Sequence, residues 1–229
     1  MTGLVVVYNT KSLIEASFTS TRKFHPNLPI LIIDGSDKNN ECFSYVKSLA
    51  DENTKIVQLE KNIGHGRGMD MGLRMIQTRH ALIFDSDIVM LKSPLSAMLE
   101  MMEEDTFGCG WINEIGFDGY DYNTFQHQIK DGPVKYLHPY FQIVNVANYK
   151  KYAPYCHHGA PCYKTMIDIH KRGLSGKILK HFPGLTGHTS GKGSNWIGRP
   201  SEYIQHDFGG TRMANKAAGK KEIIGVWEK

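Results

Sequence analysis

Two carboxylates stand two residues apart in Asp85-Ser86-Asp87, directly after the apolar run at residues 81–84. At the end of a strand, two such side chains can reach one hard divalent cation and its surrounding waters, because carboxylate oxygens are the ligands that these cations prefer. The same short pattern also occurs by chance in exposed acidic turns. Taken alone, the pair therefore leaves a metal site and a solvated turn as equal alternatives.

Two further polar clusters follow apolar runs in the same way. Tyr8-Asn9-Thr10 comes after the β-branched run at residues 4–7, and Asp34-Gly35-Ser36-Asp37 comes after the run at residues 30–33. Continuous apolar runs of this length are typical of strands that are buried on both faces of a sheet. We therefore expect three polar clusters at three strand ends.

The elements that must position these clusters alternate along the first 90 residues. Strands are expected at residues 4–7, 30–33, 55–59 and 81–84, and helices at residues 12–23, 40–49 and from about 62 to 79. This alternation with short connections predicts an α/β fold with a mainly parallel central sheet flanked by helices. Ligands of such sheets bind outside the carboxyl ends of the strands, which is where the three polar clusters lie.

The second half of the chain is less regular. Helices are predicted at residues 95–104 and 161–171, and strands at residues 107–111, 140–146 and 177–182. The segment at residues 113–135 is polar and aromatic, and the Gly, Ser, Thr and Lys content after Gly184 predicts a mobile loop. No domain boundary is visible, so a single domain is expected over residues 1–229, with one half at about 1–92 and an irregular half at about 93–229.

Composition narrows the function classes. The chain has 229 residues, 41% of them hydrophobic and 22% charged, with a net charge of +4. These values are typical of globular proteins and exclude disorder, and no apolar run approaches the roughly 20 residues of a membrane span. The four cysteines show no CxxC spacing, so we expect a reducing, cytoplasmic setting, with peripheral attachment to a membrane left open.

Taken in order, four motifs resemble the nucleotide-sugar-binding half of GT-A fold glycosyltransferases, especially those of family 2. The family has a first strand that ends near a Tyr-Asn pair, a second strand that ends in Asp-Gly-Ser, an Asn-x-Gly loop that opens a helix, and an Asp-x-Asp motif after a strand. These correspond to Tyr8-Asn9, Asp34-Gly35-Ser36, Asn62-Ile63-Gly64 and Asp85-Ser86-Asp87. Order and spacing agree over about the first 90 residues, and four motifs in sequence are far more specific than any one of them.

The resemblance implies a GT-A fold, with residues 1–92 as the nucleotide-sugar half and residues 93–229 as the acceptor half. It also implies a donor site, in which the turn after the first strand and Asp34 hold the nucleobase and ribose. Asp85 would face the ribose and metal-bound water. The implied donor-binding residues are Tyr8, Asn9, Thr10, Asp34, Asn62, Gly64, Arg67, Asp85, Ser86, Lys192 and Arg212. For Arg67, Lys192 and Arg212, a solvated cation is the alternative.

The resemblance further implies a bound Mn²⁺ or Mg²⁺, with Asp85 and Asp87 as ligands. Family members often add a late histidine that precedes a Gly/Ser-rich loop. His188, before Thr189-Ser190-Gly191, fits this description best, and His206 is the alternative.

No residue stands out as the catalytic base. Inverting family members place an acidic residue about 11 positions before the glycine that closes the acceptor-side helix, and counting back from Gly173 reaches Pro161-Cys162 instead. Candidates are left open at Glu114, Asp118, Asp121, His157 and His158, of which we name Glu114, Asp118 and His158 as the candidate bases. A retaining mechanism, which needs no such base, is left open.

The leading hypothesis is a metal-dependent glycosyltransferase that moves a sugar from a nucleoside diphosphate sugar, expected to be UDP-linked, to a hydroxyl. The hydroxyl would belong to a glycan, a lipid-linked acceptor or a small molecule. One alternative is transfer to a modified nucleic-acid base, for which the basic balance and the aromatic residues would be suited. A second alternative is a module that binds a nucleotide sugar without turnover, which the missing base would explain.

Overall fold

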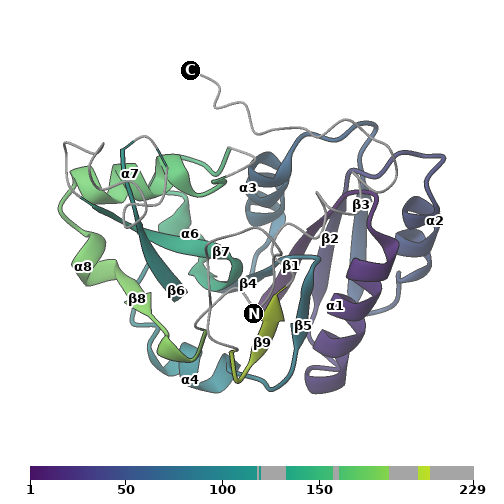
Figure 1. Cartoon of the computed structure of the whole chain (residues 1–229), viewed down its shortest axis with the longest axis horizontal. Coiled ribbons are helices and arrows are strands. Elements are labelled where there is room, and N and C mark those ends of the chain that lie inside the picture. The colour runs from purple at the N-terminus through teal and green to yellow at the C-terminus, as the bar shows by residue number, and fades with distance from the viewer. Residues whose placement is uncertain (118, 120–132, 157–159, 186–200, 207–229) are drawn as a thin grey trace.

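The computed structural model describes residues 1–117, 119, 133–156, 160–185 and 201–206 (Figure 1). The strands are β1 (Thr2–Val7), β2 (Ile30–Asp34), β3 (Thr54–Gln58), β4 (His80–Phe84), β5 (Ile88–Met90), β6 (Gly108–Ile115), β7 (Val134–Asn145), β8 (Leu179–His181) and β9 (Ile204–His206). The α-helices are α1 (Lys11–Phe24), α2 (Glu41–Ser48), α3 (His65–Met75), α4 (Leu95–Glu100), α6 (Val146–Tyr149), α7 (Tyr163–Lys171) and α8 (Ser175–Ile178), and η2 (Pro183–Leu185) is a 3₁₀ turn.

The described residues form a central seven-stranded sheet in the order β3-β2-β1-β4-β7-β6-β8. Strands β1 to β4 run parallel, as do β6 and β8, whereas β7 is antiparallel to both of its neighbours. The predicted α/β class with a mainly parallel sheet is therefore confirmed. In the sheet, β7 adjoins β4 and ends the row of parallel strands that the first half of the chain supplies.

Helices cover both faces of this sheet, and the alternation of side chains along the strands decides which face each residue serves. In β1, Leu4 packs on the face that carries α3, α6 and α7, while Val5 and Val7 pack on the face that carries α1, α2 and α4. All three side chains are buried. Because side chains on both faces of β1 are buried, its sequence is a continuous apolar run and does not alternate with polar residues.

Several predicted elements of the second half have different bounds. Helix α4 ends at Glu100 instead of residue 104, because the backbone turns back and the Glu103 N–H donates to Oγ1 of Thr106. Strand β7 begins at Val134, six residues before the predicted start, and so includes the end of the segment at residues 113–135. Only Leu179–His181 of the predicted strand at residues 177–182 is extended, because α8 occupies residues 175–178.

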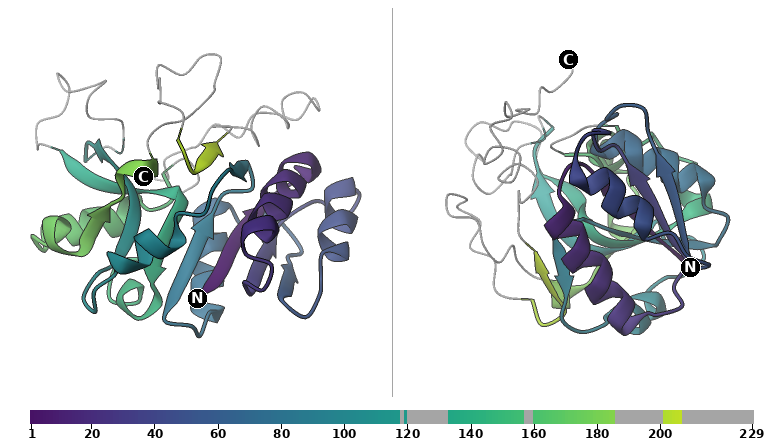
Figure 2. Two further views of the ribbon diagram at one scale, coloured as in Figure 1. Left: turned by 90° about the horizontal axis from the view of Figure 1, so that it is seen from below. Right: turned by 90° about the vertical axis from the view of Figure 1, so that its right-hand side faces the viewer.

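A short ribbon of β5 and β9 was not predicted from the sequence. It stands apart from the central sheet in the turned views (Figure 2). The two strands are antiparallel, and their register places Ile88 opposite His206 and Met90 opposite Ile204. The ribbon therefore brings a residue from near the end of the chain beside the turn that follows β4.

Helix α3 lies unusually close to β1 because two of its residues are glycines. A Cβ on Gly68 would lie 2.8 Å from Cγ1 of Val6, and a Cβ on Gly72 would lie 2.3 Å from Cδ1 of Leu4. Contacts this short do not occur between real carbon atoms, so both positions require glycine for this approach. The glycine-rich segment thus sets the height of α3 above the sheet.

The substitution Gly72→Ala should lower the free energy of unfolding by about 1–3 kcal/mol, because Leu4 is fully buried and cannot yield to the added methyl group. Gly176→Ala is the matched control, since a Cβ there meets no atom within 4 Å, and its effect should stay below about 1 kcal/mol. Urea denaturation measures both. Equal stability of the two variants would contradict the close approach of α3 and β1.

Candidate metal and nucleotide-sugar site

The Asp85-Ser86-Asp87 turn follows β4 at the carboxyl edge of the sheet, and its backbone is held from two sides. The Asp85 N–H donates to the Tyr140 carbonyl of β7 at 2.9 Å, and the Ser17 hydroxyl of α1 donates to the Asp85 carbonyl at 3.1 Å. Ser17 has no exposed surface. The position of the first carboxylate is thus determined by the sheet and by α1 together.

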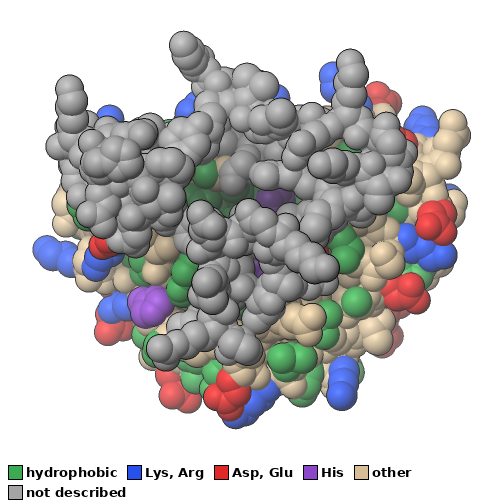
Figure 3. All heavy atoms as spheres, in the orientation of Figure 1, with side chains coloured by type: hydrophobic (Ala, Val, Ile, Leu, Met, Phe, Trp, Pro, Cys, Tyr) green, Lys and Arg blue, Asp and Glu red, His purple; other side chains and the backbone are tan. Residues whose placement is uncertain are grey.

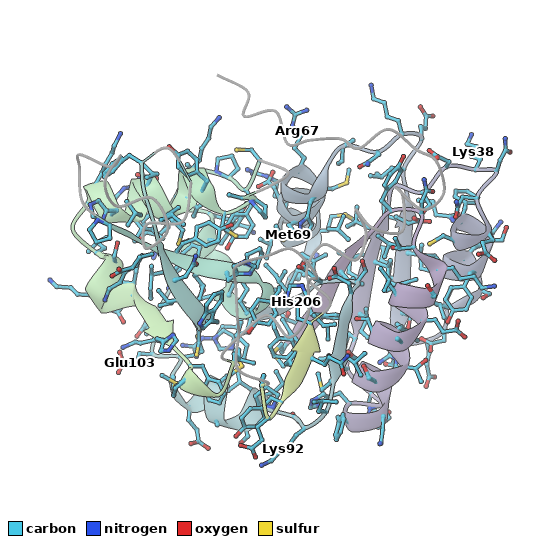
Figure 4. The ribbon with its side chains drawn as sticks, in the orientation of Figure 1. Lys38, Arg67, Met69, Lys92, Glu103 and His206 are labelled. Carbon is cyan, nitrogen blue, oxygen red and sulfur yellow. The ribbon has the colours of Figure 1, made fainter. Side chains whose placement is uncertain are left out.

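His206 reaches this turn from β9. Its Nε2 lies 3.3 Å from Oδ1 of Asp87 and 3.7 Å from Oδ2 of Asp85. Each of the three residues offers one ligand atom, and these atoms lie within 4.8 Å of one another. Figure 4 shows His206 near the middle of the molecule, and Figure 3 shows histidine at the middle of the same face.

The surroundings of His206 hold its ring in one orientation. The imidazole is 2% exposed and stacks on the ring of Tyr140, with centroids 4.7 Å apart and planes 9° from parallel. The Tyr140 hydroxyl donates in turn to the Leu185 carbonyl. A buried imidazole fixed in this way beside two carboxylates offers the oxygen and nitrogen donors that a divalent transition metal accepts.

A second histidine, His65, faces the other oxygen of Asp85. It is the first residue of α3, and its Nε2 lies 3.3 Å from Asp85 Oδ1. Burial alone would raise the pKa of Asp85, but the imidazoles of His65, His206 and His138 lower it to about 2. Burial likewise opposes the charge on His65, and the Asp85 carboxylate outweighs it and raises the pKa of that imidazole.

Sequence reasoning did not single out His65. The Asn-x-Gly motif drew attention to Asn62, Gly64 and Arg67, yet the residue that contacts Asp85 is the one directly after Gly64. Part of the signal was available, since a helix that follows a parallel strand begins at the carboxyl edge of the sheet, and His65 is the first residue of α3.

Asn9, a predicted nucleobase residue, binds Asp37 across the ends of β1 and β2. Asn9 Nδ2 donates to Asp37 Oδ2 at 2.8 Å, and the Asp37 N–H donates to Asn9 Oδ1 at 2.9 Å. The Asn9 N–H also donates to the Ser36 hydroxyl at 2.9 Å. Asn9 has a φ of 55°, a left-handed conformation that asparagine tolerates better than most residues.

Asp34 is fully buried, and both carboxylate oxygens face protein donors. Oδ1 accepts from the Ser36 N–H at 2.9 Å and Oδ2 from Nε2 of Gln58 at 3.3 Å. In this geometry the carboxylate shapes the turn after β2. Its role as an acceptor for the nucleobase, expected from the resemblance, stays a prediction.

The remaining donor-site candidates are placed as follows. Thr10 and Ser86 are buried, Tyr8 is half-buried, and Asn62 accepts from the Gly64 N–H at 2.8 Å, where Gly64 has a φ of 86°. Arg67 is exposed at the outer side of α3 and points away from His206 in Figure 4. Lys192, Arg212 and His188 lie outside the described residues.

Of the three candidates for a catalytic base, Glu114 lies within the described residues. Glu114 is half-buried on β6 and pairs in register with Lys135, five residues along β7 from the Tyr140 that holds Asp85. At about 3.3 Å per residue, this is on the order of 16 Å along the strand. Asp118 and His158 lie outside the described residues. Cys162 is buried, and burial raises the pKa of its thiol to about 12, which makes it unsuitable as a base.

A mostly parallel sheet covered by helices, with an Asp-x-Asp turn at its carboxyl edge, defines the GT-A fold of glycosyltransferases, and solved structures of that class share this architecture. The sequence agrees with the architecture. Residues 4–168 match the family model described as Glycosyl transferase family 2. The chain belongs to this family.

Among the solved structures, mannosyltransferase PcManGT from Pyrobaculum calidifontis, in complex with GDP-Man and Mn²⁺, is similar with a TM-score of 0.57 and 15% identity over 80% of this chain and 54% of its own. S. aureus TarS 1-349 has a TM-score of 0.53 and 15% identity, over 95% of this chain and 64% of its own. GalNAc-T7 with UDP, GalNAc and Mn²⁺ has a TM-score of 0.53 and 13% identity, over 80% of this chain and 42% of its own.

The chain thus spans between about two-fifths and two-thirds of the length of these structures. No curated protein matched the sequence. Among the described residues, no helix combines the length and apolar character that crossing a membrane requires.

The two hydrogen bonds that the Asn9 side chain makes with Asp37, here called the Asn9–Asp37 clamp, lead to a stability prediction. Asn9→Gly removes the side-chain hydrogen bonds to Asp37 and should lower the free energy of unfolding by about 1 kcal/mol or more. Asn9→Ala should cost a further ~1 kcal/mol, because alanine resists the left-handed conformation that glycine adopts freely. Urea denaturation of the pair measures the difference, and an alanine variant as stable as the glycine variant would contradict the conformation of Asn9.

Proposed function

We propose that this chain is the catalytic domain of a metal-dependent glycosyltransferase that moves a sugar from a nucleoside diphosphate sugar to a hydroxyl. The observation that carries the proposal is the cluster of Asp85, Asp87 and His206 at the carboxyl edge of a family 2 fold. In α/β sheets this edge is where ligands bind.

The donor set supports Mn²⁺ as the resident ion in preference to Mg²⁺. Asp87 and His206 would bind it directly, and Asp85 would bind it directly or through water. Imidazole nitrogen suits transition metals, whereas Mg²⁺ prefers oxygen ligands and keeps several waters. A bound ion would stabilise the negative charge on the departing nucleoside diphosphate as a Lewis acid.

The protein residues around this centre would hold the donor in place. The Asn9–Asp37 clamp and the turn at Asp34 shape the ends of β1 and β2, beside which a nucleobase and ribose would lie. We assign the donor site to this edge together with Tyr8, Thr10, Asn62, Gly64, Arg67 and Ser86, and to Lys192 and Arg212 from the sequence. UDP-linked sugars remain the expected donors; of the solved structures named above, PcManGT holds GDP-Man, and GalNAc-T7 holds UDP and GalNAc.

The acceptor is proposed to be a hydroxyl of a glycan, a lipid-linked sugar or a small molecule. Slow hydrolysis of the donor separates this proposal from a module without turnover, because an active transferase that holds metal and donor can use water as acceptor. Hydrolysis of GDP-Man and UDP-GlcNAc with Mn²⁺ is therefore the direct test of an enzymatic function. A lack of hydrolysis together with nucleotide binding would favour the binding module.

Thermal unfolding with UDP, GDP, CDP and dTDP tests the metal-dependent donor site. One nucleotide should raise the melting temperature only when Mn²⁺ is present, since a ligand at 100 times its Kd adds about 2.7 kcal/mol to the stability of the folded state. Asp87→Asn should abolish this shift while the metal-free melting temperature changes little. A shift that persists in Asp87→Asn would contradict the metal assignment.

The third ligand can be tested by comparing the two histidines that the sequence left as alternatives. His206→Ala should weaken Mn²⁺ binding at least tenfold, because the imidazole lies 3.3 Å from Asp87 Oδ1. His188→Ala should weaken it much less, and His25→Ala, whose imidazole contacts Ser93 away from the turn, is the matched control. Loss of the free-ion EPR signal measures Mn²⁺ binding, and the reverse order of effects would transfer the ligand to His188.

A further inference from the structure

We propose that His65 is the positioning residue of the metal centre, and that it orients the Asp85 carboxylate by donating its Nε2–H to Oδ1. This inference rests on the proposed metal-dependent function. It adds a residue that neither the motifs nor the family resemblance assigned.

The two oxygens of Asp85 face different elements of the fold. Oδ1 lies 3.3 Å from His65 Nε2 on α3, and Oδ2 lies 3.7 Å from His206 Nε2 on β9. Oδ1 is buried, and no hydrogen bond among the described residues reaches it; the His65 imidazole lies beside it, with its Nε2 at ion-pair distance. One oxygen is thus turned toward α3, and the other is left for the cluster that contains Asp87 and His206.

The backbone contacts of Asp85 do not by themselves orient its carboxylate. The Tyr140 carbonyl and the Ser17 hydroxyl fix its N–H and its carbonyl group, but rotation about the last side-chain bond would still exchange the two oxygens. A donor on one oxygen removes that freedom. Outer contacts of this kind orient metal ligands and make them better donors.

The position of His65 is set by rigid elements. Gly64 turns the chain with a φ of 86°, after Asn62 accepts its N–H at 2.8 Å, and α3 begins at the next residue. Gly68 and Gly72 then bring α3 close to β1. Because β1 pairs directly with β4, the strand that ends before Asp85, the imidazole and the carboxylate are held by adjoining parts of one core.

The geometry separates this role from direct ligation. The three ligand atoms that lie within 4.8 Å of one another belong to Asp85, Asp87 and His206, and His65 is outside this group. Its nitrogen approaches the far oxygen of Asp85 instead. His65 therefore acts on the metal through the carboxylate.

The test is a Mn²⁺ titration of the nucleotide-free protein, followed by the free-ion EPR signal. His65→Ala should weaken Mn²⁺ binding tenfold or more. His65→Gln should stay within about threefold of the wild type, because its amide nitrogen is separated from Cα by the same number of bonds and still donates. His65→Asn, whose amide is one bond shorter, should behave like alanine and replaces it if the alanine variant does not fold.

His25→Gln is the matched control and should bind Mn²⁺ like the wild type. Unchanged or tighter binding by His65→Ala would overturn the proposal, the latter because it would show that the imidazole repels the ion. Failure of His65→Gln to restore binding would also overturn it, since the donated hydrogen bond would then not be the cause. A wild type that binds no Mn²⁺ would instead contradict the metal site itself, and the positioning role with it.

Discussion

Two negative charges at the end of a buried strand are the constraint on which the site depends. Asp85 and Asp87 lie close together at the edge of the sheet, and carboxylates removed from water need partners of opposite charge or good donors. These partners include imidazoles from two other elements, His65 on α3 and His206 on β9. A divalent cation would balance the remaining negative charge of the two carboxylates. The surrounding fold brings these partners to the end of the strand.

Helix α3 and the β5–β9 ribbon carry these two histidines, and different contacts position each of them. Helix α3 is placed by glycines that let it approach β1, and its first residue then faces Asp85. The ribbon is placed by pairing, with His206 opposite Ile88, the residue after Asp87. The two histidines approach opposite oxygens of Asp85, so loss of either element would leave that carboxylate only partly compensated.

Much of the first half was predictable because its signals are local. The strand ends, the helices and the Asp-x-Asp turn follow from apolar runs and turn residues that lie next to one another in the sequence. His206 was named only as an alternative to His188, because its place depends on a three-residue strand that pairs with another of equal length. His65 was missed since no local pattern reveals which side chain of a glycine-rich segment meets a carboxylate 20 positions later. The buried role of Asp34 was also hidden, because a strand-end carboxylate looks the same whether a ligand or Ser36 donates to it.

The ribbon cannot be stable as an isolated pair of strands, since a two-stranded element has only marginal stability in water. Ile88, Met90 and Ile204 supply what is missing, because all three are almost completely buried in the core layer that also contains Tyr140. The same layer stacks Tyr140 against the imidazole of His206. Apolar packing, more than the few hydrogen bonds of the ribbon, therefore holds the histidine at the metal site, and changes in that layer would reach the site without altering any of its ligands.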